Sequence, residues 1–240
     1  MRRWLNVLID AIFPADCEAC GRPLPLGHGS FLCDGCRGGM SPIPMPLCAT
    51  CGAPLPVAVG PSCSACLRHP PRFTTARAAA LYLPAATGLN PLAVSVQALK
   101  YRRRRSLAGA LGELLAERYP FAGDAVLVPV PLHPARLRAR GFNQAVLLAR
   151  ALARRRGLHV AARLLVRTRA TDPQPGLSAS ARRRNLRGAF ALRAGMCLPD
   201  RPLVLVDDVL TTGATADACA RVLRAAGAPR VDVYTLGRAP

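Results

Sequence analysis

Residues 203–215 read LVLVDDVLTTGAT. Four apolar residues precede two aspartates, and a loop of small and hydroxylated residues follows. A short apolar run bounded in this way is typical of a buried β-strand, so we expect a strand at 203–206 that ends at the acids. Thr215 is a favourable N-cap residue, and we expect a helix over 215–226 to begin there.

The loop between this strand and this helix has the composition of an anion site. Its backbone N–H groups can converge at the positive end of the helix, where they attract phosphate. Glycine lets the backbone approach a ligand closely. Neither GxxxxGK[ST] nor GxGxxG occurs in the chain, which argues against the common nucleotide-binding loops. We therefore predict a phosphorylated-sugar site in which Asp207 and Asp208 accept hydrogen bonds from sugar hydroxyls. The predicted phosphate ligands are Thr211, Thr212, Gly213, Ala214 and Thr215.

The surrounding sequence alternates between strand-like and helix-like patterns. Helical spacing covers 106–118 and 143–156, and strands are expected at 126–130, near 162–166, at 189–192, at 203–206 and at 231–236. Such alternation indicates an α/β fold with a parallel sheet, helices on both faces and ligands at the carboxyl ends of the strands. We expect this domain to span residues 72–240.

Eight of the ten cysteines form four C-x-x-C pairs, and the surrounding text is duplicated: CEACGRPLP at 17–25 matches CATCGAPLP at 48–56. A two-residue gap lets both thiolates face one ion, and the glycine after the first pair of each repeat permits a tight turn. We predict two structural zinc ions in a module over residues 14–71, each local to its repeat, with a cross-braced pairing left open. The predicted ligands are Cys17, Cys20, Cys33, Cys36, Cys48, Cys51, Cys63 and Cys66.

Disulfides are the alternative for these cysteines, and a reducing compartment disfavours them. Thioredoxin-like chemistry would need one C-x-x-C in a βαβ setting rather than four among prolines. Residues 14–71 are rich in Pro and Gly and show little periodicity, so metal rather than apolar burial must hold them together. Cys219 lies on the apolar side of the predicted helix at 215–226, where a buried thiol is expected.

Residues 1–13 have arginines before an apolar stretch, as in a signal peptide. Asn6 and Asp10 interrupt that stretch, and no small-residue cleavage site follows, so we expect an amphipathic helix. The chain has no apolar run of 18 residues, which excludes a membrane-spanning helix on sequence grounds. We expect a cytoplasmic protein. The apolar side of the N-terminal helix would carry Trp4, Leu5, Leu8, Ile9 and Ile12.

The formal net charge is +20, and Lys100 is the single lysine among the 33 basic residues. A GC-rich genome explains the choice of arginine over lysine but not the excess of positive charge. Between residues 125 and 199 the arginines face one acid, Asp172. Such a stretch attracts polyanions, either phosphorylated small molecules or nucleic acid, unless it is a solvated surface.

The stretch LVLVDDVLTTGAT is similar to the phosphoribosyl pyrophosphate (PRPP) motif of type I phosphoribosyltransferases. More narrowly, the chain resembles the ComF family over nearly its full length. One departure is the run Arg102–Arg105, where the family often has a glycine. The matching segments are the paired C-x-x-C region, ALKY at 98–101, VPVPLHPARLRARGFNQA at 128–145, RTRATDPQPGLSASARRRNLRGAF at 167–190 and the PRPP motif.

The resemblance implies a type I phosphoribosyltransferase-like domain that binds PRPP with Mg²⁺. It assigns Asp207 and Asp208 to the ribose 2- and 3-hydroxyls, as the catalytic pair, and the TTGAT loop to the 5-phosphate. The loop after the strand at 126–130, with Arg140, is placed like the pyrophosphate loop. The segment containing Arg182 is placed like the flexible loop that closes over PRPP, and Lys100 could meet a phosphate oxygen.

Two functions are compatible with these features. In the first, the PRPP site serves a protein that handles single-stranded DNA during competence and DNA uptake, with competence-machinery partners such as a helicase. The positive charge favours this function. Tyr101 beside Arg102–Arg105 also favours it, because an aromatic ring can stack on a base while neighbouring cations contact the phosphate backbone. The alternative is an active phosphoribosyltransferase of nucleotide metabolism that transfers phosphoribose from PRPP to a base or amine, with electrostatic stabilisation of the oxocarbenium.

Overall fold

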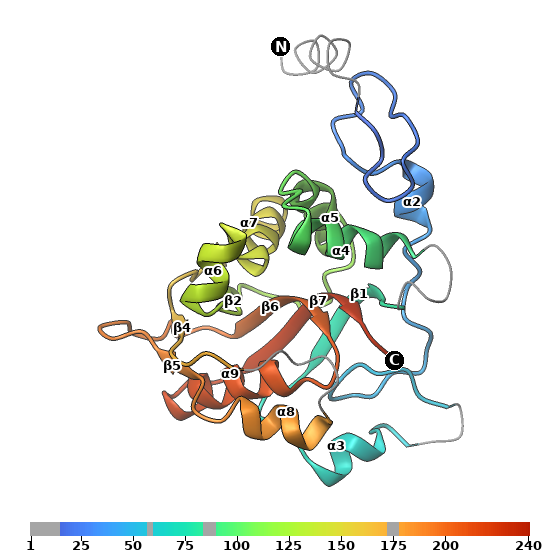
Figure 1. Cartoon of the computed structure of the whole chain (residues 1–240). Coiled ribbons are helices and arrows are strands. Elements are labelled where there is room, and N and C mark those ends of the chain that lie inside the picture. The colour runs from blue at the N-terminus through green and yellow to red at the C-terminus, as the bar shows by residue number, and fades with distance from the viewer. Residues whose placement is uncertain (1–14, 57–59, 84–89, 172–177) are drawn as a thin grey trace.

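The structure is a computed structural model that describes residues 15–56, 60–83, 90–171 and 178–240. The predicted N-terminal helix at 1–13 lies outside these residues. Five parallel strands form the central sheet in the order β1-β7-β6-β2-β3 (Figure 1). Their bounds are β1 Ala76–Leu81, β2 Val126–Pro129, β3 His159–Val160, β6 Leu203–Leu210 and β7 Val231–Arg238.

Helices cover both faces of this sheet, as predicted (Figure 1). Alternate strand residues point to opposite faces, so the two faces build two cores. Leu127, Val204 and Val206 belong to the core that contains α4, α5 and α7. Val128 and Leu205 belong to the core that contains α9. The helix bounds are α4 Pro91–Tyr101, α5 Leu107–Glu117, α6 Pro134–Arg140, α7 Gln144–Arg156, α8 Ala179–Asn185 and α9 Ala214–Ala225.

The strand that contains the two aspartates is longer than the sequence predicted. It does not end at Asp207 but continues to Leu210, because its carboxyl end pairs with β7 over residues 207–210. On the other side the pairing with β2 stops at Val206, which leaves that edge facing a cavity. The predicted N-cap, Thr215, was also wrong: Gly213 occupies the N-cap position of α9.

The strands expected near 162–166 and at 189–192 are not part of the parallel sheet. Residues Leu165–Arg167 (β4) and Phe190–Leu192 (β5) pair antiparallel in a separate two-stranded ribbon. Apolar patterning indicates a strand but does not specify its partner, and these three-residue segments are too short to imply one. The structure also contains β1 and α4, which the sequence reading did not identify.

The cysteine-rich segment packs against the α/β domain through apolar and charged contacts. Leu32 and Met40 join the core that contains α4 and α5. Arg37, in the short helix α2 (Asp34–Gly38), forms ion pairs with Glu113 and Glu117 of α5. The second repeat, which includes α3 (Ser64–Arg68), is joined to β1 by its own backbone contacts. Within the described ranges, no helix has the length and apolar character needed to cross a membrane.

Candidate functional site

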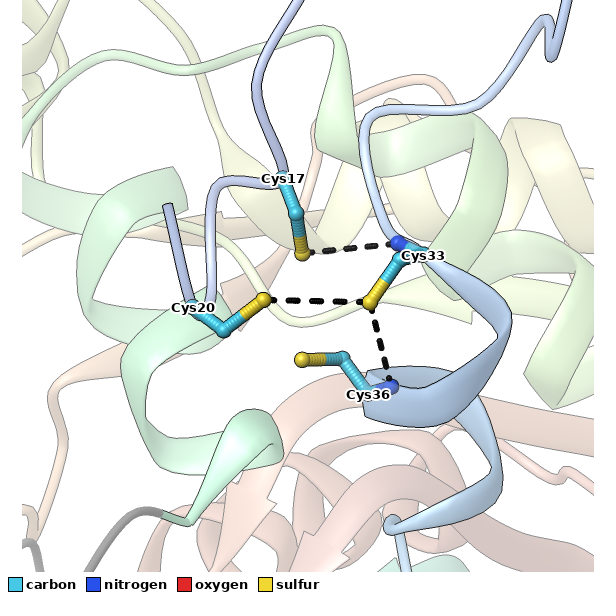
Figure 2. Close-up of side chains that lie close together, drawn as sticks. All are labelled: Cys17, Cys20, Cys33 and Cys36. Carbon is cyan, nitrogen blue, oxygen red and sulfur yellow. Dashed lines mark hydrogen bonds between the residues drawn. The ribbon is translucent and has the colours of Figure 1, made fainter. Parts of the chain in front are cut away.

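The four C-x-x-C pairs form two separate clusters of thiols. Figure 2 shows the first cluster, in which one turn and the start of α2 direct their sulfur atoms toward a common centre. Within each cluster the sulfur atoms lie within 4.8 Å of one another. The pairing is therefore local to each repeat, which excludes the cross-braced arrangement. The clusters are Cys17, Cys20, Cys33 and Cys36, and Cys48, Cys51, Cys63 and Cys66.

The chemistry of both clusters fits zinc. Four sulfur donors suit tetrahedral Zn²⁺, which binds thiolates. The backbone N–H of Cys33 donates to Cys17 Sγ and that of Cys63 to Cys48 Sγ, each at 3.4 Å. Burial alone would raise the pKa of the Cys17 and Cys48 thiols, but backbone N–H donors outweigh it and lower each pKa to about 6. These two thiols are thereby prepared as thiolates. The glycine after each of these turns has a positive φ, 73° at Gly21 and 66° at Gly52, as the sequence reading required.

The aspartates of β6 line a cavity of about 850 Å³ at the carboxyl end of the sheet. Lys100, from the last turn of α4, also lines it, and its Nζ lies 2.6 Å from Asp208 Oδ1. The Asp208 side chain is buried, and its Oδ2 has no hydrogen-bond partner among the described residues. An ion pair and an unsatisfied carboxylate oxygen thus lie at the same edge of the cavity.

Asp207 has a raised pKa. Burial raises its pKa to about 7, repulsion from Asp208 acts in the same direction, and Lys100 opposes both. Asp207 Oδ1 accepts a hydrogen bond of 2.9 Å from the backbone N–H of Asp208. Near neutral pH the pair can therefore hold or release one proton, and in its ionised form it can accept hydrogen bonds from two hydroxyls or hold a cation.

The loop that follows β6 has the conformation expected of an anion site. Gly213 adopts φ +77° at the start of α9, a conformation that glycine takes without strain. Thr212 Oγ1 accepts from the Ala214 N–H at 3.4 Å, and Arg182 donates to Thr211 Oγ1 at 3.3 Å. Of the five predicted phosphate ligands, Thr212 is not in contact with the cavity; those that line it are Thr211, Gly213, Ala214 and Thr215.

The cavity wall is positively charged, because it is lined by Arg103, Arg136, Arg140, Arg167 and Arg182. Arg140, predicted from the sequence, lies in α6 with its guanidinium 5.7 Å from the centre of the Tyr101 ring, and it donates to Gln144. Arg136 comes from the same helix. Arg167 was not singled out from the sequence; it lies at the end of β4, is buried, and donates to the Thr171 hydroxyl. Burial lowers its pKa, and the charge of Arg136 lowers it further.

Arg238, at the end of β7, is a second residue that the sequence reading missed. Its guanidinium is buried and donates to the carbonyl oxygens of Leu210, at 3.2 Å, and Thr211, at 2.8 Å. The same side chain lies 4.0 Å from Cys51 Sγ. One residue therefore connects the second thiol cluster to the start of the loop. The sequence carries no signal for this contact, because it joins segments that are far apart in the chain.

The arginine run after α4 makes internal contacts in this structure. Arg103 donates to the Ala139 carbonyl at 2.7 Å, and its φ of 54° is the left-handed value that a glycine would adopt freely. Arg104 pairs with Glu18 at 3.2 Å. Arg105 lies 5.4 Å from the centre of the Phe142 ring. Three arginines of this run are therefore already engaged by the protein.

A parallel sheet with helices on both faces, two acids at the end of a central strand and a TTGAT loop entering the next helix together define a type I phosphoribosyltransferase-like fold. A family model described as a double zinc ribbon domain matches residues 8–67, in agreement with the two thiol clusters. The protein thus combines a zinc ribbon module with a phosphoribosyltransferase-like domain.

Curated relatives match the chain over nearly its whole length. The chain is 36% identical to DNA utilization protein YhgH of Escherichia coli K12 over 232 residues, which cover 94% of this chain and 97% of the relative. It is 32% identical to Competence protein F of Haemophilus influenzae over 219 residues, with 87% and 90% covered. The chain belongs to the ComF family, which these relatives represent.

Two solved structures show lower similarity. The allosteric regulatory enzyme of purine biosynthesis is 21% identical, with a TM-score of 0.40, over 58% of this chain and 29% of that chain. A hypoxanthine phosphoribosyltransferase from Staphylococcus aureus is 14% identical, with a TM-score of 0.32, over 55% of this chain and 60% of that chain.

Proposed function

We propose that this protein binds PRPP with Mg²⁺ in the cavity at the end of β6 and takes part in handling single-stranded DNA during DNA uptake in the cytoplasm. The observation that carries the PRPP proposal is the arrangement of Asp207, Asp208 and the 211–215 loop around one cavity. A phosphorylated sugar needs both anion donors and hydroxyl acceptors, and the two lie next to each other here.

Each part of PRPP has a chemical counterpart in the cavity wall. The 5-phosphate fits the N–H groups and hydroxyls at the start of α9, where the helix end is positive. The ribose hydroxyls fit the ionised Asp207 and Asp208. The pyrophosphate fits the guanidinium groups of Arg136 and Arg140, because charge-assisted hydrogen bonds to phosphate are the strongest available here. Bound Mg²⁺ would neutralise part of the pyrophosphate charge.

The proposed role in DNA handling is supported by the relatives and by the charge. The relatives carry the names DNA utilization protein and Competence protein F. A net charge of +20 attracts a polyanion much larger than PRPP. A protein with this role would act with other components of the competence machinery, among which a helicase is the partner we propose.

Phosphoribosyl transfer is a second candidate function, and the size of the cavity favours it. Beyond the acids and the loop, the cavity of about 850 Å³ is also lined by Tyr82, Val130 and Val233. Of these, the partly exposed Tyr82 gives an acceptor base or amine a surface to bind beside the ribose. Release of pyrophosphate from PRPP in the presence of candidate bases and amines would establish this function, and its absence across all acceptors would favour a binding role.

Thermal unfolding with and without PRPP and Mg²⁺ tests the binding proposal. A ligand that binds only the folded state raises the unfolding temperature, by a free energy of about 2.7 kcal/mol at 100 times its Kd. We expect a clear rise for the wild type and little for a variant carrying Asp207→Asn and Asp208→Asn. Exchange of the exposed Asp124 for Asn is the matched control and should leave the rise unchanged. An equal rise in the double variant would contradict the site.

A further inference from the structure

A second cavity, of about 700 Å³, lies between α8 and α9, which are neighbours in Figure 1. Its lining includes the buried Leu186 and Phe190 and the partly exposed Ala218 and Val222, and the last two form an apolar floor. We call this cavity the α8–α9 groove. Its volume is in the range that holds a small organic ligand or a short piece of a polymer. This partly exposed floor offers an apolar surface on which a flat apolar group of a ligand can pack.

The rim of the α8–α9 groove is strongly basic. Arg183, Arg184 and Arg187 line it and are exposed. None of these three side chains makes an ion pair or a hydrogen bond with any residue that the structure describes. Arg221 also lines the groove, but it is paired with Asp217 at 3.0 Å. Three uncompensated charges therefore surround an apolar surface.

The ligand that satisfies both features must combine several negative charges with flat apolar groups. Single-stranded nucleic acid does so, because phosphates meet guanidinium groups while the faces of unpaired bases pack on apolar side chains. Inorganic phosphate or pyrophosphate would use the arginines but leave the floor exposed. The arginine run 102–105 is less suited, since three of its members are engaged by Ala139, Glu18 and Phe142.

We infer that the α8–α9 groove is a binding site for single-stranded nucleic acid, distinct from the cavity at the end of β6. The inference rests on the proposed role in DNA handling and gives that role a location. Bases lie on the apolar floor at Ala218 and Val222, and phosphates lie at Arg183, Arg184 and Arg187.

Helix α8 lines both the α8–α9 groove and the cavity at the end of β6 (the PRPP cavity), and the two cavities are separate. Arg182 lines the PRPP cavity and donates to Thr211, whereas the next two residues of the same helix line the groove. Ala214, at the start of α9, lines both. Because the arginines face different cavities, a nucleic-acid strand and PRPP can be bound at the same time.

Binding of a fluorescent oligothymidylate, followed by anisotropy at several salt concentrations, tests the inference. The variant changes Arg183, Arg184 and Arg187 to Ser. Each phosphate contact contributes about −0.7 to the slope of log affinity against log salt for single strands, so the loss of three contacts should flatten the slope by about 2. The matched control changes Arg68, Arg150 and Arg154 to Ser; these arginines are also exposed, and they line neither cavity. For this control we expect the slope to change by less than about 0.7, which is the contribution of one phosphate contact.

A second pair of variants tests the apolar floor. Ala218 lies in α9 and lines the groove, so Ala218→Glu places a charge where bases would lie. Gln97→Glu adds the same charge at an exposed position of α4. We expect tenfold or greater weakening for Ala218→Glu and less than threefold for Gln97→Glu. Equal effects of the two would contradict base binding in the groove, and unfolding temperatures near the wild-type value establish that both variants fold.

The outcomes separate this inference from the proposed function. If the wild type does not bind the oligonucleotide at all, the proposed DNA role fails and the inference fails with it. If the wild type binds but the α8 variant behaves like its control, the site is elsewhere and the DNA role stands. Pyrophosphate provides an independent measurement on the wild type: stoichiometric displacement of the strand by pyrophosphate at constant ionic strength would place the strand in the PRPP cavity and overturn the inference.

Discussion

Replacing Lys100 by Met should destabilise the protein strongly, because Lys100 is the ion-pair partner of a buried carboxylate. Lys100 Nζ lies 2.6 Å from Asp208 Oδ1, and the other oxygen of Asp208 has no partner among the described residues. Removing one member of a buried ion pair typically costs about 3–5 kcal/mol, since the remaining charge is left uncompensated. We expect a loss in that range at pH 8, measured by urea unfolding.

The loss should be smaller at low pH. Burial already raises the pKa of Asp207 to about 7, and removing Lys100 takes away the charge that opposes this rise. A carboxyl with a raised folded-state pKa contributes its full stability below its unfolded pKa and loses it as the pH rises through the folded value. Protonation near pH 5 therefore relieves the repulsion between Asp207 and Asp208. The difference between wild type and variant should grow from pH 5 to pH 8.

Two further variants control for other effects of the substitution. Lys100→Arg keeps the charge and should lose much less stability than Lys100→Met. Adding Asp208→Asn to Lys100→Met removes the uncompensated charge and should recover stability, which a double-mutant cycle would measure as coupling. A loss below about 1 kcal/mol for Lys100→Met at pH 8, the value for an exposed ion pair, would refute this account of the buried pair.

Three other predictions follow from the same structure. Metal analysis should find two zinc ions per chain. The Cys48→Ser variant should lose one of them, and the control Cys197→Ser, at an exposed cysteine outside both clusters, should lose none. A wild-type content below one zinc ion per chain would contradict both sites. Affinity for PRPP should rise between pH 6 and pH 8 as Asp207 ionises, by up to tenfold per pH unit below the pKa of Asp207. In calorimetry, the Asp207→Asn variant should show a weaker pH dependence of PRPP affinity than the wild type. Arg238→Met should lower the free energy of unfolding, measured in urea, by about 1.5–3 kcal/mol, because the carbonyls of Leu210 and Thr211 lose a charged donor. An unchanged free energy of unfolding would show that this contact does not stabilise the protein.

The sequence predicted the parts of the fold that depend on local patterning. Alternating apolar runs identified β2, β6 and β7 and the helices α5, α7 and α9, and the repeated C-x-x-C text identified both thiol clusters. These features are readable because each is encoded within a short segment. Repetition of the whole unit also favoured clusters local to each repeat, but the structure was needed to exclude the cross-braced pairing.

The features that the sequence did not reveal depend on contacts between distant segments. The extension of β6 through the aspartates requires a partner strand that continues beside it, and β7 is that partner. The pairing of β4 with β5 rather than with the sheet is likewise a tertiary outcome. The sequence predicted that Lys100 meets a phosphate oxygen, which stays a prediction; its ion pair with Asp208 was not foreseen, because it joins distant segments. The predicted roles of Arg140 and Arg182 stay predictions, although both residues line the cavity.

Calorimetric titration of PRPP into the zinc-loaded protein in the presence of Mg²⁺ measures directly whether the cavity at the end of β6 binds PRPP. We expect saturable binding of one PRPP per chain. This binding should be lost in the folded Asp207→Asn, Asp208→Asn variant and retained in the variant that lacks Arg183, Arg184 and Arg187. Wild-type affinity in the aspartate variant, or no binding by the wild type, would contradict the claim that the cavity at the end of β6 is a PRPP site.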